Sequence, residues 1–251
     1  MHDHTTPRDL NEYLGYYNEL PFERIAETFR RDEVLKIIER LRTKKLGEIG
    51  CGANSIFNSL DSSIGGFIVE PIAELLILQK SISSKVTTYC GQIEELETHK
   101  VEQVDTLLLS SILHEVENAE DFLDKALKTL EEGGYVVCVV PNSASIHRYV
   151  GWQKGILENI SSQTETQKLM QQRQEVFSKE TLPEFFKKMN VTEIETYSFM
   201  PKLLSHSQMQ EILDKEVINF EFLRILNSIS ALLEPVGSEL MYIGQKNERK
   251  N

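Results

Sequence analysis

The sequence predicts an α/β fold with a doubly wound parallel sheet. Short apolar runs alternate with segments of helical periodicity, a glycine turn follows the first run, and a carboxylate ends the second. Alternation of this kind is typical of strands buried between helices on both faces of a sheet. The expected strands lie at 45–50, 66–70, 85–89, 104–109 and 134–140, and the helices between them at 54–60, 71–81 and 118–131.

An amphipathic helix is predicted before the first strand, over residues 20–42, because apolar side chains recur there at helical spacing. Beyond the fifth strand the pattern predicts a helix over 181–189 and a strand over 191–199. The stretches 142–180 and 200–236 do not fit a minimal sheet. Insertions after strands five and six would lie above the edge where open sheets bind ligands, so both are expected to shape a substrate pocket.

The glycine turn predicts a site for a nucleoside cofactor. Gly50 and Gly52 follow the first strand, where they let the backbone pass close to a ligand, and Glu70 ends the second strand. A carboxylate about 20 residues after such a turn can accept both hydroxyl hydrogens of a ribose. A dinucleotide site would need a third glycine where Ser55 stands. Glu48 would repel a pyrophosphate but suits the ammonium group of a methionine moiety.

Glu-x-Gly-x-Gly followed by an acidic strand end resembles class I S-adenosylmethionine-dependent methyltransferases. The resemblance covers residues 44–198 in order, and a final strand near 237–245. Residues 89–96 resemble the family's third-strand motif, with Gln92 in place of the usual acid, and residues 104–116 resemble its fourth strand and exit. The pattern is completed by the expected turn Glu132-Gly133-Gly134 before the fifth strand and, after this strand, by Pro141-Asn142.

The resemblance implies a Rossmann-like, mostly parallel sheet of seven strands whose last strand, at 239–245, is antiparallel. It also implies two parts of the chain. Residues 1–43 form an aromatic segment and a helix that cover the cofactor, and residues 44–251 form the methyltransferase domain with its two insertions. S-adenosyl-L-methionine is the implied cofactor, and the implied activity is the transfer of its methyl group.

The resemblance further implies which residues bind this cofactor. Glu70 is expected to hold the ribose hydroxyls, and Gln92 with Ile93 the adenine edge. Glu48 and the turn backbone suit the methionine portion, while a tyrosine hydroxyl and a guanidinium suit its carboxylate. The expected cofactor-binding residues are Tyr17, Arg31, Glu48, Gly50, Cys51, Gly52, Glu70, Pro71, Gln92, Ile93 and Ser110.

Two strings in the insertions resemble a bacterial methyltransferase subgroup that often serves cell-surface polysaccharide or sugar-nucleotide pathways. They are P-N-x-x-S-x-H-R-x-x-G, which begins at Pro141, and K-x-L-S-x-x-Q-M, which begins at Lys202. Related sequences show Gly-His-Arg-Arg where this chain has Gln171-Gln172-Arg173-Gln174. The resemblance implies a small, sugar- or phosphate-bearing acceptor that is methylated on oxygen.

Histidine is the side chain best tuned to accept the proton of a sugar hydroxyl near neutral pH. Two histidines compete for this role: His114, which follows strand four, and His147, which follows strand five. The alternatives are a helix-cap or packing role for His114 and a hydrogen bond that holds the loop for His147. An acceptor oxygen that is already anionic would need no base. Arg148, Tyr149 and His206 are expected to bind the acceptor, Arg148 as a partner of phosphate or carboxylate.

Charge and composition exclude several classes of protein. The chain of 251 residues has 27 basic and 39 acidic side chains and a net charge of −12, which argues against nonspecific binding to nucleic acid or anionic membranes. No apolar run reaches about 18 residues, and the start is polar, so neither a transmembrane span nor a secretory signal is expected. We expect a cytoplasmic enzyme with a small-molecule acceptor. Its oligomeric state is not predicted.

The cysteines and the N-terminal histidines predict no metal or redox site. Cys51, Cys90 and Cys138 show no C-x-x-C spacing and are expected in the core. His2 and His4 alternate near the chain start, where a flexible segment rarely supplies a structural metal site. Three alternatives from other classes remain: a noncatalytic protein that binds the same cofactor or scaffolds a partner, a dehydrogenase, and a purely structural glycine turn.

Overall fold

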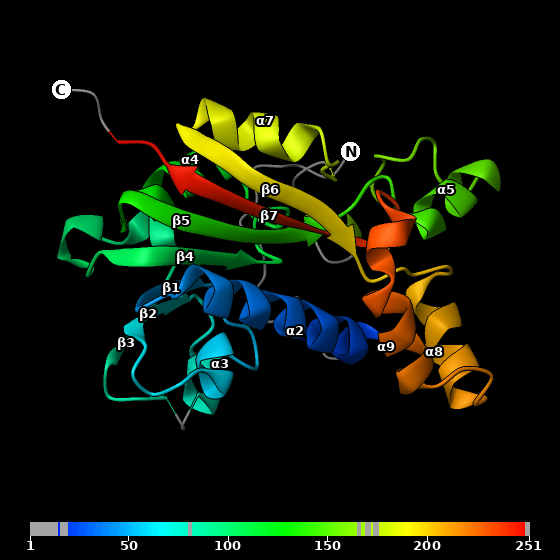
Figure 1. Cartoon of the computed structure of the whole chain (residues 1–251), viewed down its shortest axis with the longest axis horizontal. Helices are drawn as coiled ribbons and strands as arrows, with labels where there is room; N and C mark the ends of the chain where they lie inside the picture. Colours follow the sequence, from blue (N-terminus) through cyan, green and yellow to red (C-terminus); the bar gives the residue numbers. More distant parts are fainter. Residues whose placement is uncertain are drawn as a thin grey trace.

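The computed structural model describes residues 15, 20–79, 82–164, 167–168, 172 and 176–248. Seven strands form one sheet in the order β3-β2-β1-β4-β5-β7-β6 (Figure 1). The pairs among β1 to β5 are parallel, whereas β7 runs antiparallel to both β5 and β6. The predicted sheet and its antiparallel last strand are therefore confirmed. The strands are β1 (Lys45–Ile49), β2 (Gly65–Glu70), β3 (Val86–Cys90), β4 (Val104–Ser110), β5 (Leu130–Pro141), β6 (Val191–Phe199) and β7 (Glu239–Lys246).

Helices cover both faces of this sheet. They are α2 (Glu23–Leu41), α3 (Ala73–Leu78), α4 (Ala119–Leu127), α5 (Ile146–Gln153), α7 (Thr181–Lys188), α8 (His206–Asp214) and α9 (Phe220–Ser228). Successive residues of a strand point to opposite faces, so each strand contributes to two cores. Leu107 and Leu109 of β4 join one core with α4 and α7, whereas Leu108 joins the other with α2, α8 and α9.

Three helices gather at one end of the sheet. Figure 1 shows α5, α8 and α9 at the end toward which β4, β5 and β6 point. All three belong to the stretches 142–180 and 200–236 that were expected above this edge. None of the helices in the described part of the chain has the length and apolarity needed to span a bilayer.

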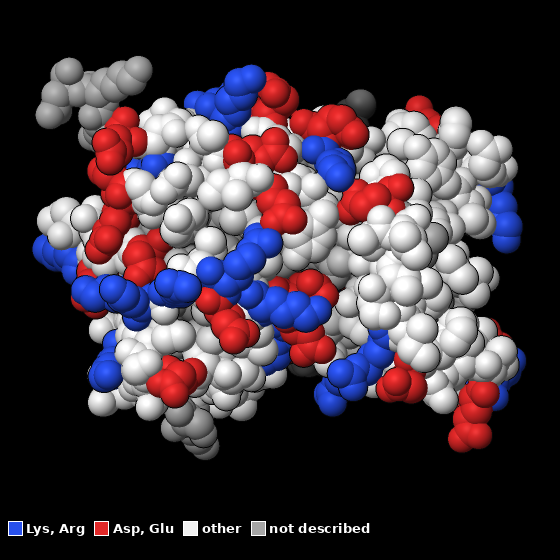
Figure 2. Space-filling view, viewed as in Figure 1, with Lys and Arg blue, Asp and Glu red and all other residues white. Residues whose placement is uncertain are grey.

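Acidic and basic side chains are intermixed on the face shown in Figure 2. They are frequent over α2 and the strands and sparse over α9, where Phe220, Phe222 and Ile225 are exposed (Figure 2). On this face, therefore, the acidic excess of the sequence does not form a patch of one sign.

The expected helix over 54–60 is wrong. Only a single 3-10 turn, η1 (Ile56–Ser59), forms there, and Ser55 caps it. The guanidinium of Arg31 binds the carbonyls of residues 54–56, which would otherwise accept the hydrogen bonds of an α-helix. Serine and asparagine side chains also favour caps and turns over helix interiors.

Three other local expectations are wrong. The helix expected over 118–131 ends at Leu127, and Leu130 already pairs with Val104 as the first residue of β5. The expected turn at 132–134 is part of this strand, where the register shifts. Cys90, at the end of β3, is exposed, whereas Cys51 and Cys138 are buried as expected. β3 is an edge strand, so its last residues have a neighbouring strand on one side only.

Tyr242 of β7 buries its hydroxyl with no hydrogen-bond partner among the residues that the structure describes. Its ring stacks on Phe186 of α7, with centroids 4.1 Å apart. An unsatisfied buried hydroxyl costs about 1–3 kcal/mol, so Tyr242→Phe is expected to raise the free energy of unfolding by about 1 kcal/mol in urea titrations. Tyr197→Phe is the control, because that hydroxyl lies 3.5 Å from Glu33 Oε2. Equal gains in both variants would contradict this explanation.

Candidate active site

The glycine turn after β1 exposes its backbone at the carboxyl edge of the sheet. Gly50 and Gly52 have φ angles of +78° and +55°, a region that favours glycine. A Cβ at Gly52 would meet no heavy atom within 4 Å, so this side of the turn borders open space. The N–H of Gly50 donates to the carbonyl of Val69 at 2.8 Å and fixes the turn beside the end of β2.

A cavity of about 1080 Å³ lies against this turn. Its walls come from α2, the ends of β1, β2, β4 and β5, the start of β7, residues 156–164 and the N-terminus of α8. A second cavity of about 1480 Å³ shares Gly50, Pro71, Ile112 and Glu115 with the first. Together the two cavities have room for a nucleoside cofactor and a second small molecule.

Most of the sequence-predicted cofactor residues border these cavities. Pro71, Gln92 and Ile93 line the second cavity, where Ile93 is buried and Gln92 is exposed. Tyr17 lies outside the described residues. The first cavity is lined by Arg31, Glu48, Gly50, Cys51, Gly52, Glu70, Pro71 and Ser110.

Glu70 ends β2 and places its buried carboxylate at the edge of the first cavity. Its two oxygens accept hydrogen bonds from the N–H groups of Gly52, at 3.2 Å, and Ile72, at 3.1 Å. Burial raises the pKa of Glu70. Because each carboxylate oxygen keeps a further lone pair, the oriented group can still accept two hydroxyl hydrogens.

Glu48 and Arg31 hold the loop that follows the turn. The Glu48 carboxylate accepts hydrogen bonds from the Ser55 hydroxyl and the Ile56 N–H, and burial raises its pKa to about 7. The Arg31 guanidinium donates to the Ser55 carbonyl at 2.8 Å and to the carbonyls on either side of it. Both side chains border the cavity, but their contacts with described residues position the loop.

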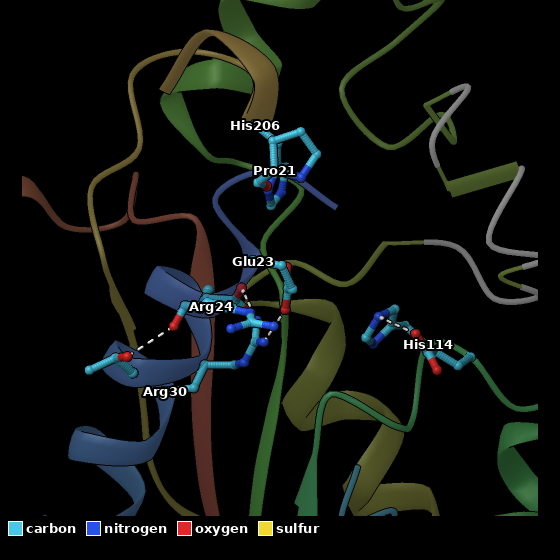
Figure 3. Close-up of polar contacts among 9 residues, drawn as sticks. Pro21, Glu23, Arg24, Arg30, His114 and His206 are labelled. Atoms are coloured by element: carbon cyan, nitrogen blue, oxygen red, sulfur yellow. Dashed lines mark hydrogen bonds and ion pairs between the residues drawn. The ribbon is translucent and has the colours of Figure 1, made fainter. Parts of the chain in front are cut away.

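Three histidines border the first cavity from different elements. His114 follows β4, is buried, and places Nε2 3.9 Å from the Glu115 carboxylate. His147 lies in the first turn of α5, and His206 begins α8, with Nδ1 3.1 Å from the Pro21 carbonyl. Figure 3 shows His206 beside Pro21, and His114 on a separate loop. One cavity therefore gathers both candidate bases and the predicted acceptor-binding histidine.

Two of these histidines are neutral at pH 7. The pKa of His147 is lowered well below its ordinary value, first by burial and then by Lys202, His206 and Arg148. Its Nδ1 has no hydrogen-bond partner within the described part of the chain. Burial, followed by Lys202, lowers the pKa of His206 to about 4. Because the Pro21 carbonyl accepts the Nδ1 proton of His206, its Nε2 is the nitrogen without a proton.

Acid is expected to destabilise the protein through His206. The unfolded imidazole has its pKa near 6.5, whereas the pKa in the folded protein is about 4. Below pH 6.5 the unfolded state binds more protons, so this group removes about 3 kcal/mol of stability by pH 4. His206→Asn keeps a donor to Pro21 and should lose this part of the pH dependence in urea unfolding. The same loss of stability in variant and wild type would refute the assignment.

Arg148 and Tyr149 are not placed as the sequence led us to expect. The buried Arg148 guanidinium donates to two carbonyls of the loop 160–162 and to Gln167 Oε1, so it fixes the wall of the first cavity. Tyr149 is 40% exposed, packs against Trp152 and borders neither cavity. Neighbouring residues of a helix point in different directions, so when Arg148 points inward Tyr149 faces away. Its expected contact with an acceptor is not supported.

The stretch compared above with Gly-His-Arg-Arg reaches this site. Gln172, at the position compared with the histidine, borders the first cavity. Gln171, Arg173 and Gln174 lie outside the described residues, as do His2 and His4.

A set of buried charged side chains was missed by sequence reasoning. Lys202, which follows β6, is 3% exposed, and Glu239, which begins β7, is 6% exposed. Arg30 of α2 pairs with Glu239 at 3.1 Å and with Glu23 (Figure 3). The sequence did contain a signal for this set, because Lys202 and Glu239 adjoin apolar residues. Charged residues are rarely buried, so a charged residue next to an apolar run can indicate a functional site. We call the following residues, which all border the first cavity, the charged wall: Glu23, Arg30, His147, Arg148, Lys202, His206 and Glu239.

Residues 47–138, which contain the glycine turn, Glu70 and His114, match the model of a protein family described as a methyltransferase domain. The match covers less than half of the chain and indicates a methyltransferase domain in this part of it. The match ends within β5, so the stretches 142–180 and 200–236 lie outside it. No curated protein sequence matches the chain.

Solved structures of methyltransferases share the fold. The plantazolicin methyltransferase BpumL, solved with a monoazolic desmethylPZN analog and SAH, is 18% identical, with a TM-score of 0.54 over 95% of this chain and 90% of its own. A Thermotoga maritima protein described as a possible histamine N-methyltransferase is 18% identical, with a TM-score of 0.59 over 94% and 99%. A SAM-dependent methyltransferase from Archaeoglobus fulgidus is 15% identical, with a TM-score of 0.55 over 90% and 99%.

The residues at both cavities fit S-adenosylmethionine as the cofactor of the methyltransferase. When bound, this cofactor supplies a methyl group on a cationic sulfonium. The open side of the turn at Gly52 admits a ligand close to the backbone, and Glu70 offers oriented oxygens at the end of β2. Glu48 and Glu70 give the first cavity an acidic end, which suits the positive charges of the sulfonium and the ammonium.

Proposed function

We propose that this methyltransferase transfers a methyl group to a hydroxyl oxygen of a small, sugar- or phosphate-bearing acceptor in surface-polysaccharide biosynthesis. The observation that supports the proposal best is the charged wall in the cavity that also contains Glu70 and the glycine turn. Along the sheet, β2-β1-β4 adjoin most of the residues proposed to bind the cofactor, and β5-β7-β6 adjoin wall residues. Cofactor and acceptor would thus bind beside one another along the same edge.

For the cofactor we propose that Glu70 holds the ribose hydroxyls and that Gln92 and Ile93 border the adenine. Glu48 and the backbone of 50–52 would face the methionine portion. Leu20 and the first turns of α2 already line the cavity, which supports a covering role for the segment 1–43. Residues 44–251 would then form the catalytic domain.

In the proposed reaction a lone pair of the acceptor oxygen forms the new bond to the methyl carbon. The carbon–sulfur bond breaks with its electrons remaining on sulfur, and the hydroxyl proton passes to a base of the chain. We favour His147, which is neutral at pH 7, over His114, the other candidate base. Burial of the wall side chains excludes water and holds the acceptor in line, which can supply much of the rate.

The test is a screen of purified protein with S-adenosylmethionine and separate panels of sugar phosphates, nucleotide sugars, amines and peptides. Mass spectrometry would follow both S-adenosylhomocysteine and the methylated product. We expect turnover with a sugar-bearing acceptor and a methyl ether in the product. Turnover confined to amines, the class named for the Thermotoga maritima structure, would overturn the proposal of oxygen as the target.

A noncatalytic cofactor-binding protein is the second candidate. The observation that favours it is Gln172, an amide that borders the cavity at the position compared with an ionisable histidine. Tight binding of S-adenosylmethionine without formation of S-adenosylhomocysteine in any panel would support this alternative.

A further inference from the structure

Lys202 is a buried ammonium that has no partner among the described residues. It is 3% exposed, borders the first cavity, and forms no hydrogen bond or ion pair with any residue that the structure describes. A buried charge without a partner is strongly unfavourable. Burial accordingly lowers the pKa of Lys202 to about 8, against the opposing influence of Glu239 and Glu23. The cavity that Lys202 borders gives an anionic ligand a route to this ammonium.

The carboxylates of the wall pair with Arg30, although Oε2 of Glu239 has no hydrogen-bond partner among the described residues. Arg30 pairs with both Glu23 and Glu239, and it draws one oxygen of Glu239 away from Lys202. Burial raises the pKa of Glu239. The ion pairs of both carboxylates with described residues are made to Arg30, not to Lys202.

Arg148 is a second cation of the wall that forms no ion pair with a carboxylate in the described part of the chain. The groups that its guanidinium binds are carbonyls and the amide oxygen of Gln167, which are all neutral. His147 and His206 are neutral at pH 7 because of their lowered pKa values. The charged wall therefore holds one more cation than it holds carboxylates.

The two halves of the cavity thus differ in sign. Glu48 and Glu70, with Arg31 beside Glu48, border the half at β1 and β2, where the carboxylates outnumber this cation and suit a cationic ligand. Arg148 and Lys202 border the half at β5 and β6, which suits an anionic one. A cationic cofactor and an anionic acceptor would each meet the opposite charge in the part of the cavity assigned to them.

We infer that Lys202 binds an anionic group, a phosphate or a carboxylate, carried by the acceptor. The inference rests on the proposed function for the role of this cavity half and deepens it, because it assigns the anion to one residue. An ammonium that faces a phosphate or carboxylate oxygen forms a charge-assisted hydrogen bond, which is stronger than one between neutral groups. Lys202 would thereby act as a specificity-determining residue, which fixes the acceptor while a histidine takes the proton.

Calorimetric titration with small anions tests this inference. Protein saturated with S-adenosylhomocysteine is titrated with inorganic phosphate in one arm and with acetate in the other. We expect the wild type to bind at least one of them, and Lys202→Met to weaken that binding at least tenfold, as the loss of a charge-assisted bond of about 1.5–3 kcal/mol predicts. Binding of phosphate but not acetate would indicate a phosphorylated acceptor. Binding of acetate but not phosphate would indicate an acceptor with a carboxylate.

Matched variants separate charge from folding. Lys202→Arg keeps the cation and should bind the same anion within about threefold, whereas Lys188→Met, at an exposed lysine of α7, should match the wild type. Lys202→Gln repeats the loss of charge should the methionine variant fold poorly. Absence of anion binding in the wild type, or equal binding after loss of the charge, would overturn the inference.

Failure of the inference and failure of the proposed function give different results. The same samples are titrated with S-adenosylhomocysteine before the anion is added. Cofactor binding without anion binding overturns the role of Lys202 and leaves the methyl-transfer proposal standing. Anion binding without cofactor binding overturns the methyl-transfer proposal and leaves the role of Lys202 in anion binding standing.

Discussion

Replacing Glu70 with alanine is expected to weaken the binding of S-adenosylmethionine about 100-fold. The carboxylate stands at the end of β2, and two backbone N–H groups orient it beside the first cavity. Two charge-assisted hydrogen bonds to ribose hydroxyls contribute about 1.5–3 kcal/mol each, so the loss of both corresponds to two or more orders of magnitude in affinity. Calorimetric titration with S-adenosylmethionine and S-adenosylhomocysteine measures the change.

Two further variants separate the ligand contact from the turn geometry. Glu70 also holds the N–H of Gly52, so its removal could loosen the turn. Glu70→Gln keeps an acceptor oxygen for the turn and should lose less affinity than the alanine variant. Glu74→Ala, at an exposed position of α3, should bind like the wild type. Unchanged affinity in a folded Glu70→Ala protein would mean that the ribose lies elsewhere.

His147→Asn is expected to lower kcat by a factor of about 100 to 10,000 with little change in cofactor affinity, as the loss of a general base predicts. His147 borders the cavity, and burial together with Lys202 keeps it neutral and able to accept a proton. Because its pKa lies well below 6.5, wild-type kcat should not fall between pH 8 and pH 6.5 through protonation of this group. The assay uses whichever acceptor supports turnover in the screen described above.

The competing base is tested in the same assay. His114→Asn removes the histidine that follows β4, and His99→Asn, at an exposed histidine, serves as the control. The proposal for His147 requires that its variant lose far more activity than the other two. A large loss confined to His114→Asn would transfer the role to that residue.

The arrangement of the sheet could be predicted because buried strands and their covering helices leave a local pattern. The runs that become β1, β2, β4 and β5 are apolar because helices cover both of their faces. The ends of the helices and strands were harder to predict from the sequence. The contact between Arg31 and the loop 54–56 joins two elements, and no pattern within residues 54–60 indicates that it replaces a helix.

The residues proposed to bind the cofactor could be predicted from the sequence, whereas the charged wall could not. The cofactor half lies in one short stretch, so the glycine turn and Glu70 were visible in sequence. A guanidinium binds carbonyls and carboxylates with the same donors, so sequence could not show that Arg31 and Arg148 would bind loops. The charged wall joins Glu23 with Lys202 and Glu239, residues that only the fold brings together.

The wide separation of the wall residues along the chain bears on how this protein could diverge. Its members come from the start of α2, the first turn of α5, the segment after β6, α8 and the start of β7. Exchange of a single segment between related proteins would therefore bring in only part of a new acceptor site. Arg30, shared between Glu23 and Glu239, would lose a partner in such an exchange. New acceptor preferences should accordingly arise by paired substitutions in distant segments, while the turn that serves the cofactor stays unchanged.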